Sequence, residues 1–287
     1  MKKTLLIALG AVASSTVFAA YPNLGVETTF NRIGLIGNSN SFVGSGTIIS
    51  PNHVLTAKHV GGTWFHSRNN GQTNSGSFQS VSRINHSVAD LAILEFAPNT
   101  FSTWWRPVYA NQLGTVPTMA GFGLTANLRA NGTGYNFVNN SNGIRRRTVN
   151  TADVRFSVNL GAGITNSVSL LYDLDGAPGA PGDVNTYGAG NPVAGEGGIL
   201  SGDSGGAWLV PNGASWNIIG VNSFIFDAGG VGGPLNNFLD WGDGGGAVDL
   251  FQYETWIETN APVPEPASMI ALGLGVAALA ARRRRRK

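Results

Sequence analysis

The sequence predicts an all-β fold, from its short β-type runs between polar turns and from its low content of charged residues. Short runs of β-branched and aromatic residues recur along the chain, separated by turns rich in glycine, asparagine and serine. Only 12% of the residues are charged, against about 25% in an average soluble protein. The chain has no cysteine, so side-chain packing and not disulfide bonds must hold the strands together.

The N-terminal segment, residues 1–19, has the parts of a secretory signal peptide. Two lysines precede an apolar run at 5–12, and Val17-Phe18-Ala19 forms a small-x-small cleavage site. We therefore expect signal peptidase to cut after Ala19, with Ala20 as the alternative, and to release an exported domain.

The C-terminal segment, residues 261–287, is also a targeting signal. Pro-Glu-Pro at 264–266 precedes an uncharged apolar run at 267–281, and a cluster of arginines with a final lysine follows. This run is shorter than the roughly 17 to 25 residues of a stable membrane span, although a plain anchor is the alternative. The three parts resemble the PEP-CTERM sorting signal. That resemblance implies an exosortase partner, transient membrane contact through a short transmembrane helix at 267–281, and delivery to the cell surface or exterior.

The positive charge of the chain is concentrated in these two ends. They hold eight of its 18 basic residues and one of its 16 acidic residues, which leaves ten basic and 15 acidic residues between them. A domain with an acidic balance offers no broad basic surface for a polyanion. We therefore expect no nucleic-acid partner.

Two strands and a histidine follow one another in the first part of the domain. Residues 47–49 and 54–56 are β-branched or apolar, and a turn at 50–53 separates them. His59 stands just after the second strand, where a histidine is more often structural or solvated than catalytic.

Asp90 stands at the head of an apolar run at 91–94. A carboxylate beside a buried strand needs hydrogen-bond partners for its oxygens. Asp90 is therefore either a turn or capping residue, or an acid that holds an imidazole N–H and fixes its tautomer.

The stretch Ser201-Gly202-Asp203-Ser204-Gly205-Gly206 places a hydroxyl among glycines. Glycine allows close approach of a substrate and unusual backbone angles, which a nucleophile and an oxyanion hole both require. Ser204 is a candidate nucleophile, and the N–H groups of Gly202 and Ser204 are candidate oxyanion donors. A surface turn is the alternative.

His59, Asp90 and Ser204 occur in the order of a chymotrypsin-type triad, in which the acid orients the base and the base activates the serine. The segments around them resemble the three motifs of the trypsin/chymotrypsin-like serine proteases, and the likeness covers about residues 25–259. Residues 44–47 and 58–60 most resemble the bacterial, glutamyl-endopeptidase-like branch. The matching motifs are residues 54–60, 89–94 and 202–206.

The resemblance implies two six-stranded antiparallel β-barrels, at about 20–123 and 124–260, with the active site between them. It also implies a short C-terminal helix, and apolar residues at 250, 253, 256 and 257 do share one helical face. The implied activity is that of a serine endopeptidase acting on protein or peptide substrates through an acyl-enzyme. A non-catalytic surface or matrix binding protein on the same scaffold, or an esterase, is the alternative.

The resemblance places Gly198, Ser223, Phe224 and Ile225 in the substrate pocket. Gly198 is not acidic, and all four histidines precede residue 87, so neither a basic nor a glutamyl preference is supported. Ile225 stands where the family usually has an open glycine wall. We expect a shallow or apolar pocket for a small or apolar residue before the scissile bond.

Asp203 matches the aspartate that in this family pairs with a new α-amino group after proenzyme cleavage. No Ile-Val-Gly-Gly start follows an arginine in this chain. Three alternatives remain: signal peptidase makes the active N-terminus near Ala20, a cut occurs between Arg32 and Ile33, or Asp203 has another partner and there is no zymogen step.

Two loops in the second half carry clustered charges. We predict that residues 145–147, three arginines, form a solvated turn that could be a nicking site. Asp173, Asp175 and Asp183 lie in a glycine-rich loop and could bind Ca²⁺, although a turn without metal is the expectation. We expect no other cofactor.

Overall fold

The computed structural model describes residues 26–69, 71–176, 178–181, 185–188, 192–227 and 238–262. The predicted signal peptide at 1–19 and the predicted helix at 267–281 lie outside these residues. Within the described residues, no helix is long and apolar enough to cross a membrane.

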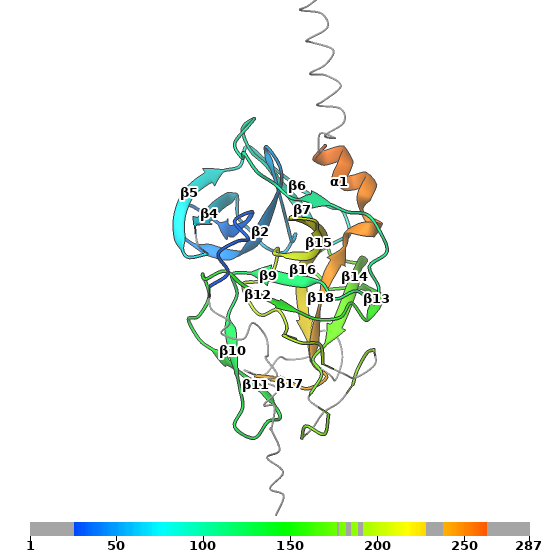
Figure 1. Cartoon of the computed structure of the whole chain (residues 1–287). Coiled ribbons are helices and arrows are strands. Elements are labelled where there is room, and N and C mark those ends of the chain that lie inside the picture. Colours follow the sequence, from blue (N-terminus) through cyan, green and yellow to red (C-terminus); the bar gives the residue numbers. More distant parts are fainter. Residues whose placement is uncertain are drawn as a thin grey trace, which may run out of the picture.

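The first half of the chain forms a seven-stranded antiparallel sheet, which is the blue and cyan part of Figure 1. Its strand order is β5-β4-β1-β2-β3-β7-β6. The turn predicted at 50–53 joins β2 to β3 as a hairpin. The strands are β1 (Ile33–Gly37), β2 (Phe42–Ser50), β3 (His53–Thr56), β4 (Trp64–Asn69), β5 (Thr73–Gln79), β6 (Ser82–Asn85) and β7 (Ala92–Glu95).

The second half forms an antiparallel path in the order β12-β9-β15-β16-β18-β14-β13, with the short β8 (Arg106–Pro107) parallel to β16. The strands of the path are β9 (Thr118–Gly121), β12 (Arg146–Val149), β13 (Val154–Val158), β14 (Ser167–Asp173), β15 (Ala207–Asn212), β16 (Ser215–Phe226) and β18 (Gly244–Asp249). A separate sheet of β10 (Thr125–Leu128), β11 (Gly134–Val138) and β17 (Phe238–Asp240) lies at the bottom of Figure 1.

The all-β class is confirmed, but the expected two six-stranded barrels are not. Within the described residues, each half has a path of seven strands that pairing does not close, and the three-stranded sheet is an addition. Its strands β10 and β11 lie between Asp90 and Ser204 in the chain, and β11 pairs with β17, which follows Ser204. The rings of Tyr135 and Trp241 pack edge to face beneath it, 5.1 Å apart.

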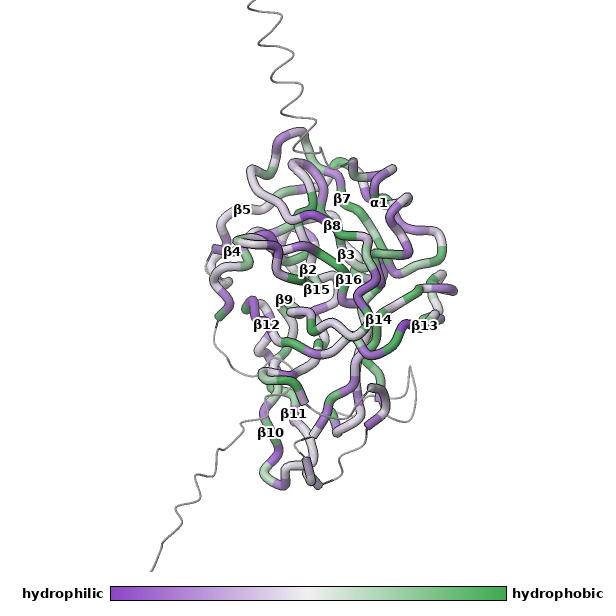
Figure 2. The backbone as a smooth tube through the Cα atoms, turned by 45° about the vertical axis from the view of Figure 1, so that its right-hand side comes forward, coloured by the Kyte–Doolittle hydropathy of each residue, from purple (hydrophilic) through white to green (hydrophobic). Residues whose placement is uncertain are grey.

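Two hydrophobic clusters hold the sheets together. The first cluster includes the interlocked rings of Phe65, Phe96 and Phe101 and continues into the second half through Leu209 and Ile218. The second cluster is centred on rings such as those of Tyr172 and Trp208. Figure 2 shows apolar stretches along strands such as β7 and β14, whose residues are mostly buried. The shared first cluster therefore joins the two halves of the chain.

A 3-10 turn η1 (Leu250–Gln252) and a helix α1 (Glu254–Asn260) follow β18. The predicted C-terminal helix is confirmed, but it begins only at Glu254, so Leu250 and Tyr253 of the predicted face precede it; both are buried, as is Ile257 within α1. The rings of Tyr253 and Trp256 also contact His86 edge to face. The helix therefore supports the segment that leads to Asp90.

The arginine triplet at 145–147 is not a solvated turn, and that prediction was wrong. Arg145 is completely buried, and Arg146 begins β12. Arg145 donates hydrogen bonds to the carbonyls of Glu27 at 3.0 Å and Ile33 at 3.2 Å, while Arg147 pairs with the Glu27 carboxylate at 2.9 Å. Burial lowers the pKa of Arg145 to about 10. Arg145 and Arg147 therefore hold the start of the described domain in place.

Candidate active site

His59 and Asp90 meet where β3 ends and β7 begins. These strands pair antiparallel with Thr56 opposite Ala92, so the residues just beyond them come together. Nδ1 of His59 lies 2.7 Å from Oδ2 of Asp90, and the backbone N–H of His59 donates to Oδ1 at 2.9 Å. Because an ionised carboxylate only accepts, Nδ1 carries the proton and Nε2 is left free to accept one.

The carboxylate of Asp90 is completely buried and is also held by the second half of the chain. Ser223 Oγ on β16 donates to Oδ2 at 2.5 Å, and the Asp90 N–H donates to Ser167 Oγ on β14 at 3.2 Å. Burial opposes ionisation, but the hydrogen bonds from His59 and Ser223 outweigh it and lower the pKa of Asp90. Ser223, predicted to line the substrate pocket, therefore holds the acid.

Ser204 lies in the loop before β15, close to the end of β3. Its carbonyl accepts the N–H of Ser45 at 2.7 Å. A Cβ added at Gly205 would lie 2.1 Å from the Ser45 carbonyl oxygen and 2.2 Å from Thr56 Oγ1, so the loop touches β3 three residues before His59. Within the described residues, no hydrogen bond joins the Ser204 hydroxyl to His59. Such bonds often form only when substrate binds.

Asp203 is buried between the two predicted oxyanion residues. Its carboxylate accepts the N–H of Gly123 at 2.6 Å and the N–H of Leu200 at 2.8 Å. A Cβ at either Gly121 or Gly123 would lie 2.5 Å from this carboxylate, which explains the Gly-Phe-Gly turn. Burial raises the pKa of Asp203 to about 7, and the positive charge of Arg146 acts in the opposite direction.

The space beneath the other predicted pocket residues is filled. A Cβ at Gly198 would lie 2.8 Å from the Tyr172 hydroxyl, and one at Gly245 would lie 2.6 Å from it. A Cβ at Gly246 would lie 2.5 Å from Cζ of Phe224, and Ile225 is half-buried. Tyr172 and the glycines of β18 were not predicted, because only strand pairing brings them to this place.

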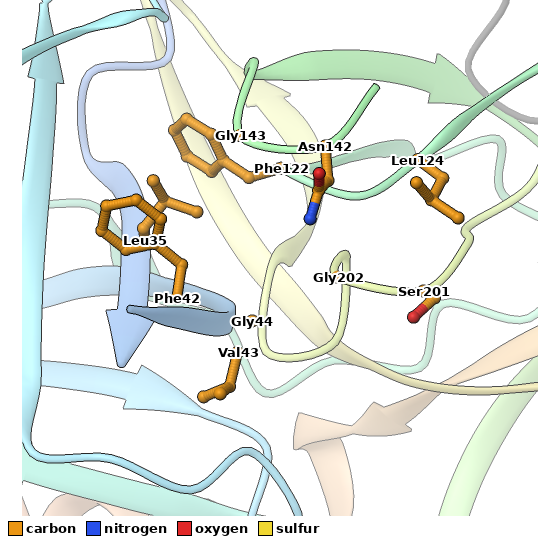
Figure 3. Close-up of a pocket in the computed structure, with 10 residues that line it drawn as sticks. All are labelled: Leu35, Phe42, Val43, Gly44, Phe122, Leu124, Asn142, Gly143, Ser201 and Gly202. Atoms are coloured by element: carbon orange, nitrogen blue, oxygen red, sulfur yellow. The ribbon is translucent and has the colours of Figure 1, made fainter. Parts of the chain in front are cut away.

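A cavity of about 350 Å³ lies on another side of Gly202, and the sequence did not predict it. Figure 3 shows Phe42 and Val43 on one side of it and Leu124 and Asn142 on the other. Gly44 lines it as well, and a Cβ there would lie 2.8 Å from both the Ser204 carbonyl oxygen and the Val60 methyls. Gly44 therefore lies between the cavity lining and the residues next to the candidate triad.

Comparison with protein families identifies the chain. The family model for trypsin matches residues 31–241. The chain belongs to the trypsin family of serine endopeptidases. The PEP-CTERM protein-sorting motif matches residues 262–286, which indicates processing by an exosortase and export to the cell surface or exterior. Both findings confirm the resemblances that the sequence suggested.

Solved structures of trypsin-like enzymes share this fold. Neuropsin, a serine protease expressed in the limbic system of mouse brain, is 14% identical, with a TM-score of 0.53 over 82% of this chain and 96% of its own. HL collagenase is 16% identical, with a TM-score of 0.53 over 84% and 97%. At this identity the likeness concerns the fold. No curated protein sequence is significantly similar to this trypsin-family chain.

The loop considered for Ca²⁺ in this trypsin-family enzyme is held by backbone amides. Asp173 Oδ2 accepts the N–H groups of Thr186 at 2.6 Å and Tyr187 at 3.0 Å. Asp183 lies outside the described residues. Within the described residues, no group of three or more histidine, aspartate or glutamate side chains is arranged to hold a metal ion.

Proposed function

We propose that this trypsin-family enzyme cleaves proteins through Ser204, His59 and Asp90 by way of an acyl-enzyme. The observation that carries the proposal is the double hydrogen bond from His59 to the buried Asp90 carboxylate. It fixes the tautomer in which Nε2 is a base, and the lowered pKa keeps Asp90 ionised when His59 becomes positive.

In this mechanism the Ser204 hydroxyl attacks the scissile carbonyl while its proton moves to Nε2 of His59. The N–H groups of Gly202 and Ser204 stabilise the oxyanion. His59 then passes the proton to the leaving amine, the C–N bond breaks, and the acyl group stays on Ser204. A water molecule then attacks the acyl group while His59 takes its proton. The ester bond to Ser204 breaks, His59 returns the proton to the Ser204 oxygen, and the carboxylic acid product leaves.

The substrate residue before the scissile bond would be small or apolar. Tyr172 and Phe224 occupy the space in which a long side chain would otherwise extend, and Gly198 supplies no charge. Cleavage of a peptide library should therefore show alanine, serine or valine before the cut. Enrichment of arginine, lysine or glutamate would contradict this pocket.

The leaving-group side of the substrate would lie against the cavity of Figure 3. His59 protonates the leaving amine, and the cavity is lined by Gly44, which packs against Val60, the neighbour of His59. Leu35 and Phe122 are buried in its wall, and Phe42 and Val43 are exposed by 44% and 53% at its rim. An apolar residue after the scissile bond fits this lining.

The route of export is also part of the proposal. Signal peptidase would remove residues 1–19, and the apolar run at 267–281 would hold the chain at the inner membrane on the periplasmic side until exosortase releases it. Both segments lie outside the described residues, so this part rests on the sequence and on the sorting motif.

Cleavage of a labelled unfolded protein tests the activity. His59→Ala and Ser204→Ala should each lower the rate by about 10⁴-fold or more, because the triad acts as a unit. Ser102→Ala, at an exposed serine, is the matched control and should cleave normally. Activity retained in either triad variant would contradict the mechanism. Hydrolysis of a small ester is measured in parallel. An esterase would hydrolyse the ester and leave the labelled protein intact.

A further inference from the structure

Ser45 binds both residues that would form the oxyanion hole. It lies on β2 in the first half and is completely buried. Its N–H donates to the Ser204 carbonyl at 2.7 Å, and its hydroxyl donates to the Gly202 carbonyl at 2.9 Å. A single side chain of the first sheet therefore reaches across to the nucleophile loop of the second.

The hydroxyl of Ser45 has a further partner that fixes its direction. It accepts the N–H of Phe122 at 3.0 Å, from the Gly-Phe-Gly turn whose Gly123 binds Asp203. A serine hydroxyl has one proton to donate, and here that proton goes to Gly202. The bond is therefore directional, and the turn, Ser45 and the loop form one connected network.

The backbone conformation of Gly202 explains why the loop needs this network. Its φ of +96° lies in the region that glycine enters readily, and glycine leaves that region just as readily. An oxyanion hole works only when its N–H groups are already aimed at the developing charge. Anchoring the carbonyls of Gly202 and Ser204 restricts the backbone of both donor residues.

The backbone around Ser45 packs closely against the nucleophile loop. A Cβ at Gly205 would lie 2.1 Å from the Ser45 carbonyl oxygen, and that oxygen already accepts the Thr56 hydroxyl at 2.7 Å. Loss of the Ser45 hydroxyl would leave the Gly202 carbonyl and the Phe122 N–H without this partner in a packed interior.

We propose that Ser45 is a positioning residue that holds the loop at 202–204 in its reactive conformation. The inference rests on the proposed function, since it names Ser45 as the residue that positions the oxyanion donors of that mechanism, the N–H groups of Gly202 and Ser204. The Ser45 hydroxyl acts through one donated hydrogen bond, to Gly202, and one accepted hydrogen bond, from Phe122. This way of ordering the loop requires no new α-amino group.

The test compares Ser45→Ala with Ser50→Ala. Ser50 is also on β2 and also completely buried, but its hydroxyl bonds His53 at 2.7 Å, away from the loop. Two readouts are made on the folded chain: hydrogen–deuterium exchange of the peptide covering 200–206, and the rate of fluorophosphonate labelling. If Ser45→Ala does not fold, Ser45→Cys replaces it, because a thiol keeps the shape but bonds weakly.

We expect exchange at 200–206 to rise about tenfold or more in the Ser45 variant, and labelling to slow by about 10- to 100-fold, less than the loss of a direct oxyanion donor. Ser50→Ala should match wild type in both. Unchanged exchange, or faster exchange with unchanged labelling, would overturn the inference. If the wild type does not label at all, the proposed function fails, and exchange alone decides whether Ser45 holds the loop.

Discussion

Ser223 Oγ lies 2.5 Å from Asp90 Oδ2, so a residue of the second half of the chain holds the acid of the first half. The same oxygen binds Nδ1 of His59 at 2.7 Å. The position of the His59 ring therefore depends on how the two halves pack together. A substitution at their interface should disturb the hydrogen bond between His59 and Asp90 even where the chain stays folded.

Asp90→Asn should lower kcat by about 10⁴-fold while the chain remains folded. An amide can present its NH₂ group to Nδ1, which would favour the wrong imidazole tautomer. Steady-state hydrolysis and circular dichroism of the same sample measure both effects. A loss of less than tenfold would mean that Asp90 does not set the tautomer of His59.

Ser223→Ala should make the enzyme less resistant to acid. The folded pKa of Asp90 is lowered, so its ionised form contributes stability above the unfolded pKa, and this contribution is lost as pH falls through the folded pKa. Removing one of the bonds that lower this pKa should move the acid-unfolding midpoint to higher pH. Ser167→Ala is the control, because Ser167 bonds the Asp90 N–H and not the carboxylate. An equal shift in both variants would contradict this account.

Arg145→Lys should reduce the free energy of unfolding by about 2–3 kcal/mol, since a buried guanidinium makes several directional bonds that an ammonium cannot reproduce. Arg147→Lys, whose side chain is 48% exposed, should change it by less than about 1 kcal/mol. Urea titration of both variants makes the comparison. Similar small losses would indicate that Arg145 does not clasp the start of the domain.

Val43→Asp should lower kcat/KM for peptides with an apolar residue after the scissile bond by about tenfold or more, because it places a charge at the rim of an apolar cavity. A small ester without residues on that side should react as before. If peptide and ester change together, the cavity does not bind the leaving-group side.

Extra residues ahead of Ala20 should leave the labelling rate unchanged within about twofold. Both oxygens of Asp203 accept backbone N–H groups, from Gly123 and Leu200, so the loop is ordered without a new α-amino group. Matched chains with and without the extension test this point. Labelling confined to the chain that starts at Ala20 would favour activation by signal peptidase.

The candidate triad could be proposed from the sequence because each of its residues stands in a short local motif. The bond from Ser223 to Asp90 could not, since it joins residues 133 positions apart through sheet docking. The burial of Arg145 could not be predicted for a similar reason: runs of arginine are usually solvated, and the carbonyls of Glu27 and Ile33 that it binds lie more than 100 residues away. The sheet of β10, β11 and β17 likewise depends on long-range pairing.

Fluorophosphonate labelling followed by peptide mapping tests the central claim most directly. We expect the wild-type chain to carry one phosphonyl group, on Ser204, and His59→Ala to remain unlabelled although Ser204 is present. Ser102→Ala should label like wild type. A folded wild-type chain that stays unlabelled, or a label on another serine, would contradict the assignment of Ser204 as the activated nucleophile.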